Sequence, residues 1–387
     1  MRLLRDVSLS AVSAGLVTVL VGFASSAVIV FQAAHALGAS EAELGSWLLS
    51  LGWGMGLTCI GLSWYYRMPV STAWSTAGAA MLISSVAGLS MAQAIGAFML
   101  SALLIIVSGF SGLFERAIKR IPLALAAGMM SGVLLRFGLN AFTALQTRFG
   151  LTLAIFAVYL LGRRLLPRYA VILALLGGLA LAAAQGLLHL GGVVPTLARP
   201  VFTMPAFSWQ ALIGVALPLF IVTMASQNVP GIGVLRAAGY RPPVSMLVGW
   251  TGIANLLLAP FGAYALNLST ITAAIVTGPE AHADPARRYI GGIAAGVFYL
   301  LLGLFGATMA ATLLALPKEL VWAIAGFALL GTIGNGLLTA LSHERHREAA
   351  LVTFLLTASG ISLFGIGAPF WGLLAGMLTL LVLHAGR

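Results

Sequence analysis

Fourteen apolar segments recur along this chain of 387 residues, and their number and length limit what it can fold into. A helix needs about 20 apolar residues to cross a bilayer. With 60% apolar and only 7% charged residues, the chain has too few polar side chains to cover a soluble domain of this size. These features predict an all-α polytopic membrane protein. The segments, seven in each half, lie near 9–34, 44–63, 74–88, 92–113, 122–145, 149–166, 169–190, 210–235, 243–259, 265–278, 287–315, 319–340, 349–364 and 367–384.

Segments three and ten are too short to span a bilayer alone, and they carry copies of one polar motif. Ser-Thr-x-x-Ala-Ala occupies 75–80 and returns 194 positions later at 269–274. Each of these segments is predicted to be a short strand followed by a half-helix. Backbone N–H groups at the start of a half-helix lack helical partners and carry partial positive charge, so inside a bilayer they need a polar partner. Matched breaks in two halves are typical of a transporter substrate site.

The basic residues predict how the chain crosses the membrane. The net charge is +11, but Lys and Arg recur between apolar segments and form no single patch that would favour nucleic acid. With the N-terminus in the cytoplasm, sixteen basic residues fall inside and three, Arg148, Arg199 and Lys318, fall outside. We therefore expect a bacterial-type inner membrane protein with both termini cytoplasmic. Because seven is odd, the second half enters the bilayer in the opposite sense, which makes a 7+7 inverted repeat.

Acidic and metal-binding residues are scarce where chemistry inside the membrane would need them. All nine Asp and Glu residues fall in termini or loops of this topology, and no His lies in the middle of a segment. The single cysteine, Cys59, has no second cysteine with which to form a disulfide or a thiolate cluster. The sequence contains no nucleotide-binding, phosphate-binding or metalloprotease motif. We therefore expect no enzyme and no bound metal or cofactor.

Segment eight places polar side chains near the middle of the membrane. Gln227 and Asn228 lie near its centre, and Pro230 leaves a carbonyl of the preceding turn without its helical donor. One alternative is that these amides only bond to neighbouring helices, just as the hydroxyl residues of segment three could simply cap its half-helix. In segment one, Gln32 shares a helix face with Ser25. This face lies either toward the predicted substrate site or toward a neighbouring helix.

Six short stretches carry a resemblance to known transporters. They are GFASS at 22–26, FQAA at 31–34, PVSTAWSTAG at 69–78, SQNVPG at 226–231, LRAAGY at 235–240 and ALNLSTITAAI at 265–275. The arrangement of segments resembles the fold of uracil/proton symporters and sulfate-type anion carriers. The stretches themselves resemble the benzoate/proton symporter family, over essentially the whole chain.

The resemblance implies a division into two parts that move against each other. A core domain would comprise 1–121 and 200–316, which hold segments 1–4 and 8–11. A gate domain would comprise 122–199 and 317–387, and relatives of this fold suggest a homodimer through it. The substrate site would lie between the two half-helix starts and segment eight. The predicted binding residues are Ser25, Ser26, Gln32, Ser71, Thr72, Ser75, Thr76, Gln227, Asn228, Asn267, Ser269 and Thr270.

The predicted function is import of an aromatic carboxylate, benzoate by the family resemblance. The predicted site holds no acid that would repel an anion. Half-helix starts and amide donors receive a carboxylate without like-charge repulsion. Aromatic side chains near the motifs could pack against the ring. They are Phe23, Trp74, Phe261 and Tyr264.

The proton is the predicted co-substrate, and its carrier is the open point of this prediction. Uracil/proton symporters place glutamates in segments eight and ten, where this chain has Gln227 and Ile271. The proton would then travel with the substrate carboxylate or couple through loop acids. The alternatives are an uncoupled or exchanging carrier of anions or nucleobases and, from a different class, a non-transporting membrane scaffold. Arg136, the one charged residue within a segment, either steers an anion or extends to the membrane surface.

Overall fold

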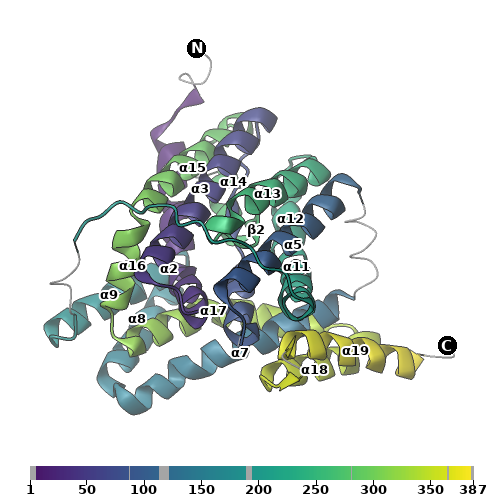
Figure 1. Ribbon diagram of the computed structural model, residues 1–387. Coiled ribbons are helices and arrows are strands. Elements are labelled where there is room, and N and C mark those ends of the chain that lie inside the picture. The colour runs from purple at the N-terminus through teal and green to yellow at the C-terminus, as the bar shows by residue number, and fades with distance from the viewer. Residues whose placement is uncertain are drawn as a thin grey trace.

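The computed structural model describes residues 6–86, 88–112, 122–188, 194–279, 281–363 and 366–384. Within them the chain forms helices and two sheets of two short strands each (Figure 1). The first half contains α2 (Leu9–Ala36), α3 (Glu41–Tyr66), β1 (Thr72–Trp74), α4 (Thr76–Ser85), α5 (Met91–Phe110), α7 (Leu123–Thr147), α8 (Phe149–Leu165), η1 (Pro167–Tyr169) and α9 (Ala170–Ala184). The second half begins with one continuous helical run of α10 (Trp209–Ala211), η3 (Leu212–Ala216), α11 (Leu217–Thr223), η4 (Met224–Asn228) and α12 (Val229–Ala237). It continues with α13 (Val244–Leu258), η5 (Ala259–Phe261), β2 (Leu266–Leu268), α14 (Ile271–Thr277), η6 (Pro285–Arg287), α15 (Tyr289–Leu304), α16 (Gly306–Leu314), α17 (Lys318–Leu341), α18 (Glu344–Ala358), β3 (Ser362–Leu363), β4 (Ile366–Gly367) and α19 (Ala368–His384).

Seven helices of the described residues are long and apolar enough to cross a bilayer by themselves. An eighth results if the two parts of α2, Leu9–Phe23 and Ser26–Ala36, which are bent by 44°, form one span. The apolar helices α4, α9 and α19 are shorter. The prediction of an all-α polytopic membrane protein is confirmed. One boundary was wrong, because segment eleven, predicted as a single stretch near 287–315, is divided at Phe305 into α15 and α16.

Local sequence explains where several helices begin. At α3 the Ser40 hydroxyl accepts from the Glu43 N–H while the Glu43 carboxylate accepts from the Ser40 N–H, and Ser90 heads the same kind of capping box at α5. The helices α7 and α17 both follow a proline, Pro122 with φ −56° and ψ 129° and Pro317 with φ −57° and ψ 134°. The two halves therefore begin corresponding helices with the same backbone geometry.

The short strands of the two halves pair with each other in the interior. β1 and β2 are antiparallel, with Thr72 opposite Leu268, Ala73 opposite Asn267 and Trp74 opposite Leu266. Ala73 and Asn267 occupy corresponding places in the sequence repeat, so the central pair joins repeat-related positions. An antiparallel pair centred in this way is what a two-fold relation between the halves would produce. The strand and half-helix predicted in segments three and ten are confirmed.

The helices pack in two groups, each of which draws on both halves of the chain. In one group α3 packs on α15 and α5 packs on α13, so each pair joins one helix from each half. In the other group α7 packs on α17, while α8 pairs with α9 and α18 pairs with α19. In Figure 1 the second group fills the lower part of the view, and α3, α5, α13 and α15 lie above it.

Glycines allow the backbones of α3 and α15 to touch. A Cβ atom at Gly52 would lie 2.7 Å from the Cα of Gly303, and one at Gly56 would lie 2.8 Å from the carbonyl oxygen of Gly296. Membrane helices gain little from burying apolar surface against each other, so close van der Waals contact at small residues is a main source of their association. This contact fixes the scaffold that holds β1.

Candidate functional site

Two half-helices begin side by side where the strands pair. The Ser75 hydroxyl caps α4 by accepting a hydrogen bond from the Gly78 N–H at 3.0 Å. The Ser75 N–H donates to the Ala265 carbonyl at 3.1 Å, which extends the strand pairing up to this helix start. Thr270 precedes α14 but makes no capping bond with its side chain. The hydroxyl oxygen of Thr270 is buried and has no hydrogen-bond partner among the described residues.

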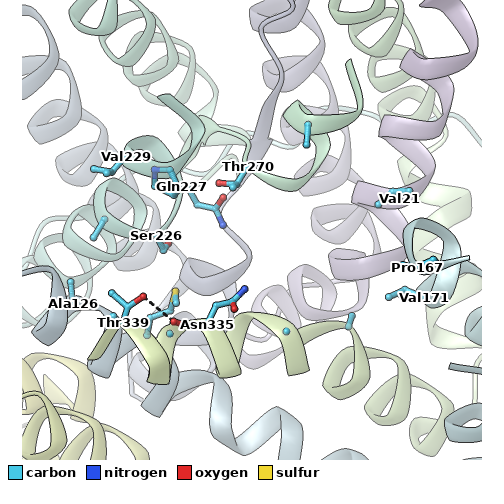
Figure 2. Close-up of a pocket in the computed structure, with 18 of the residues that line it drawn as sticks. Val21, Ala126, Pro167, Val171, Ser226, Gln227, Val229, Thr270, Asn335 and Thr339 are labelled. Carbon is cyan, nitrogen blue, oxygen red and sulfur yellow. Dashed lines mark hydrogen bonds between the residues drawn. The ribbon is translucent and has the colours of Figure 1, made fainter. Parts of the chain in front are cut away.

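A cavity of about 680 Å³ lies beside these helix starts, between the two groups of helices (Figure 2). This volume is within the usual range of small-molecule sites, roughly 300–1,000 Å³. Its walls are largely apolar and come from α7, α9 and α17 on one side and from α2, η4, α12 and α14 on the other. The polar residues that line it are Tyr159, Arg163, Ser226, Gln227, Thr270, Asn335 and Thr339.

A second cavity of about 60 Å³ lies deeper, between the strand pair, α2 and α15. Gln227 lines both cavities and so connects them. The indole N–H of Trp74 donates to the Ser26 hydroxyl at 2.8 Å, and the Thr272 hydroxyl is bonded to that of Ser269. The residues that line the second cavity are Gly22, Ser26, Met55, Ala73, Trp74, Thr76, Gln227, Ser269, Thr272 and Tyr299.

The backbone around Gln227 is wound as a π-helical turn. Within η4 the Val229 N–H donates to the Met224 carbonyl, one residue further back than in an α-helix. Such turns occur mostly as single interruptions of α-helices, frequently at functional sites. The Gln227 amide makes no hydrogen bond with another described residue, and the buried Ser226 hydroxyl has none either. The donors of Gln227 are therefore free to bind a ligand.

Five of the residues predicted to bind substrate line one of the cavities, and their contact with substrate stays a prediction. They are Ser26, Thr76, Gln227, Ser269 and Thr270. Gln32 lines neither cavity. Ser25 lies outside the residues whose side chains are described.

The other five predicted residues are buried and hydrogen-bonded within the scaffold. Asn228 accepts from the Leu268 N–H at 2.9 Å and donates to the Met224 sulfur, which clamps β2 to η4. The remaining contacts join Ser71 to Thr272, Thr72 to Thr58, Cys59 and the Met55 carbonyl, Ser75 to Gly78, and Asn267 to the Ala265 carbonyl. Of the alternatives left open by the sequence, capping of the half-helix is observed for Ser75. The side-chain oxygen of Asn267 is buried and has no hydrogen-bond partner among the described residues.

Several lining residues were not predicted from the sequence. Tyr299 faces the smaller cavity from α15, and Asn335 and Thr339 face the larger one from α17. Asn335 carried a usable signal, because it is the one amide side chain of α17 and lies within its apolar stretch. Tyr299 carried none, since an aromatic residue in an apolar helix usually packs in the core.

The charges of the described residues lie mostly away from the cavities. Arg163, at the end of α8, is the charged residue that lines the larger cavity. Arg136 lines neither cavity; it is exposed, and its guanidinium lies over Gly360, where a Cβ would approach Nη1 to 3.1 Å. Asp6 forms ion pairs of 3.7 Å with Arg67 and Arg287 outside the cavities.

Of the four aromatic residues expected to pack against a ligand ring, Trp74 lines the smaller cavity, and Phe23, Phe261 and Tyr264 line neither cavity. Tyr264 is fully buried between Trp47 and Phe98, with ring centroids 5.8 and 5.9 Å away. Phe261 packs on Phe202 with ring centroids 5.8 Å apart. Both residues precede β2 in the chain, and their rings pack on other aromatic side chains of the scaffold.

Solved structures of membrane transporters share this fold, in which half-helices meet beside a cavity. The chain superposes on the transmembrane domain of BicA, a cyanobacterial bicarbonate transporter, with a TM-score of 0.61 and 15% identity, over 95% of this chain and 97% of that one. It also superposes on SLC26A9 with a TM-score of 0.63 and 13% identity, over 96% of this chain and 65% of that one. At this level of identity the likeness shows the fold.

The sequence comparisons show the family. The family model described as "Benzoate membrane transport protein" matches residues 5–382. The chain is 37% identical to the benzoate membrane transport protein of Acinetobacter baylyi over 379 residues, 98% of this chain and 96% of that protein. It is 47% identical to the inner membrane protein YdcO of Escherichia coli K12 over 371 residues, 96% of this chain and 95% of that protein. The chain belongs to the benzoate membrane transport family, BenE, and is a transporter and not an enzyme.

Proposed function

We propose that this protein is a secondary active transporter that imports an aromatic carboxylate, benzoate in the first instance, together with a proton. The observation that carries the proposal is the Gln227 amide, which has free donors and lines both cavities beside the half-helix starts. The name of the Acinetobacter baylyi relative supports benzoate as the substrate.

The larger cavity offers a carboxylate and an aromatic ring different surroundings. Gln227 and the buried hydroxyl of Thr270 line it and have no hydrogen-bond partner among the described residues, and a bond from an amide to a charged group contributes about 1.5–3 kcal/mol. No carboxylate of the described residues lines either cavity, so an anion meets no like charge there. Ala126 and Met130 of α7 and Ile275 of α14 supply apolar surface for the ring.

Alternating access would follow from movement of the two groups of helices. We assign the core domain to 1–121 and 200–316 and the gate domain to 122–199 and 317–387, because the larger cavity is bordered by elements of both. Arg163 and Pro167, at the turn between α8 and α9, line the cavity on the side predicted to be cytoplasmic. In this topology the conformation faces inward, both termini are cytoplasmic, and the protein resides in the bacterial inner membrane, as the name of the YdcO relative suggests. A homodimer would associate through the gate domain.

The experiment is uptake of labelled benzoate into proteoliposomes, with and without an imposed pH gradient. We expect accumulation above equilibrium only when the outside is more acidic than the inside. Equilibration that ignores the gradient would indicate an uncoupled or exchanging carrier, and absence of uptake would contradict transport of benzoate.

A further inference from the structure

Asn335 places an amide in the wall of the larger cavity that faces Gln227. It lies on α17, and Figure 2 shows its side chain pointing from that helix toward the Gln227 amide on the other side. Its amide forms no hydrogen bond with another described residue. A polar side chain in a membrane helix is unfavourable unless it finds a partner or water. Asn335 is exposed in this conformation, where water can meet its amide, so the amide needs another partner only when the cavity closes.

Asn335 is the side chain through which α17 offers donors to the cavity. The Thr339 hydroxyl, one turn further on, donates to the backbone carbonyl of Asn335 at 2.9 Å. Its hydrogen is therefore used within the helix. The other α17 residues that line the cavity are Ala328, Gly331 and Gly336. Asn335 is thus a polar point in a wall of small residues.

The position of Asn335 suggests what it meets in a bound ligand. If the carboxylate lies at Gln227 and Thr270, as in the proposed function, the ring extends toward α17 and its far edge approaches Asn335. The bare edge of a benzoate ring offers the amide no hydrogen bond. When the cavity closes and water leaves, the amide would stay unpaired, which is unfavourable. A hydroxyl group on that edge would restore the hydrogen bond.

We propose that Asn335 is a specificity-determining residue that hydrogen-bonds a hydroxyl group on the ring end remote from the carboxylate, so that hydroxybenzoates are substrates as well as benzoate. This inference rests on the proposed function. It adds a ligand class and assigns its recognition to α17.

The test compares equilibrium binding of benzoate and 4-hydroxybenzoate to the purified full-length protein and to Asn335→Leu. We expect the substitution to weaken binding of 4-hydroxybenzoate by about three- to tenfold, the effect of one neutral hydrogen bond. We expect it not to weaken binding of benzoate, because the benzoate ring leaves this amide unpaired. Asn140→Leu is the matched control. Asn140 is an exposed amide on α7 that lines neither cavity, and its backbone carbonyl also accepts a hydrogen bond from a threonine hydroxyl. Asn335→Ala serves as the second variant if the leucine variant is not monodisperse.

The outcomes separate this inference from the proposed function. Equal loss of affinity for both ligands would overturn the inference, because Asn335 would then bind the carboxylate or hold the shape of the cavity. Unchanged affinity for both ligands would overturn it as well. If the wild-type protein binds neither ligand, the proposed function fails and the inference fails with it.

Discussion

Gln227 and Asn228 are adjacent in η4, yet their amides meet different surroundings. Gln227 lines both cavities and has no protein partner among the described residues. Asn228 is fully buried and holds the Leu268 N–H of β2. Successive side chains on a helix point in different directions, so Gln227 faces the cavities while Asn228 faces the scaffold. The same substitution at the two positions should therefore have different effects.

Gln227→Ala is expected to weaken benzoate binding with little change in stability. The loss of one amide bond to a charged ligand costs about 1.5–3 kcal/mol, which is roughly ten- to a hundredfold in affinity. Titration calorimetry on monodisperse protein measures this. Gln32→Ala, at an amide that lines neither cavity, is the control. Benzoate affinity equal to that of the wild type in Gln227→Ala would show that Gln227 does not bind the substrate.

Asn228→Ala is expected to destabilise the protein. It leaves the buried N–H of Leu268 without its acceptor, and an unpaired buried donor costs about 1–3 kcal/mol. The measurement is the thermal unfolding midpoint in detergent. Asn228→Asp keeps an acceptor oxygen at this place and tests whether the acceptor is what matters. An unchanged midpoint in Asn228→Ala would show that the clamp on β2 contributes nothing.

At the scale of elements, the strand pair depends on the helices that hold it. β1 lies against α3, where Thr72 bonds to Thr58 and to the Met55 carbonyl. The helix α3 also touches α15, through Gly52 and Gly303. A change in this contact would displace the support of β1 and would also press on the backbone of Tyr299, which lines the smaller cavity.

Gly52→Ala is expected to lower stability, because its new Cβ would lie 2.7 Å from the Cα of Gly303, too close for a backbone atom to yield easily. Overpacking of this kind typically costs about 1–3 kcal/mol. Gly61→Ala is a control on the same helix, since nothing lies within 4 Å of a Cβ there. Unfolding midpoints of the two variants decide the matter, and equal midpoints would contradict the close contact.

At the scale of the whole molecule, the larger cavity lies between two groups of helices that both halves of the chain build. A site placed there can be exposed to either side of a membrane by a relative movement of the groups, without unfolding either one. Which side it faces in this conformation follows from the orientation of the chain, and that orientation is open to direct measurement.

Two single cysteines test the orientation. Ala42 begins α3 on the side predicted to be outside, and His343 precedes α18 on the side predicted to be cytoplasmic; both are exposed. With an impermeant maleimide on spheroplasts, we expect Ala42→Cys to react at once and His343→Cys to react only after permeabilisation. The native Cys59 is buried and should stay unlabelled. Reversed labelling would refute the predicted topology.

The sequence by itself determined the class of protein, the fourteen segments and the two half-helices that begin near Ser75 and Thr270. These features follow from local hydrophobicity, from segment length and from a repeated motif, all of which can be read along the chain. Only the tertiary structure decided which polar side chains reach the cavity. Gln227 and Asn228 carry the same side-chain amide at the same depth. Asn335 lines the same cavity as Gln227, although the two are more than a hundred residues apart in the sequence. The direction of a side chain depends on the helices packed around it, and those contacts are not encoded in any local pattern.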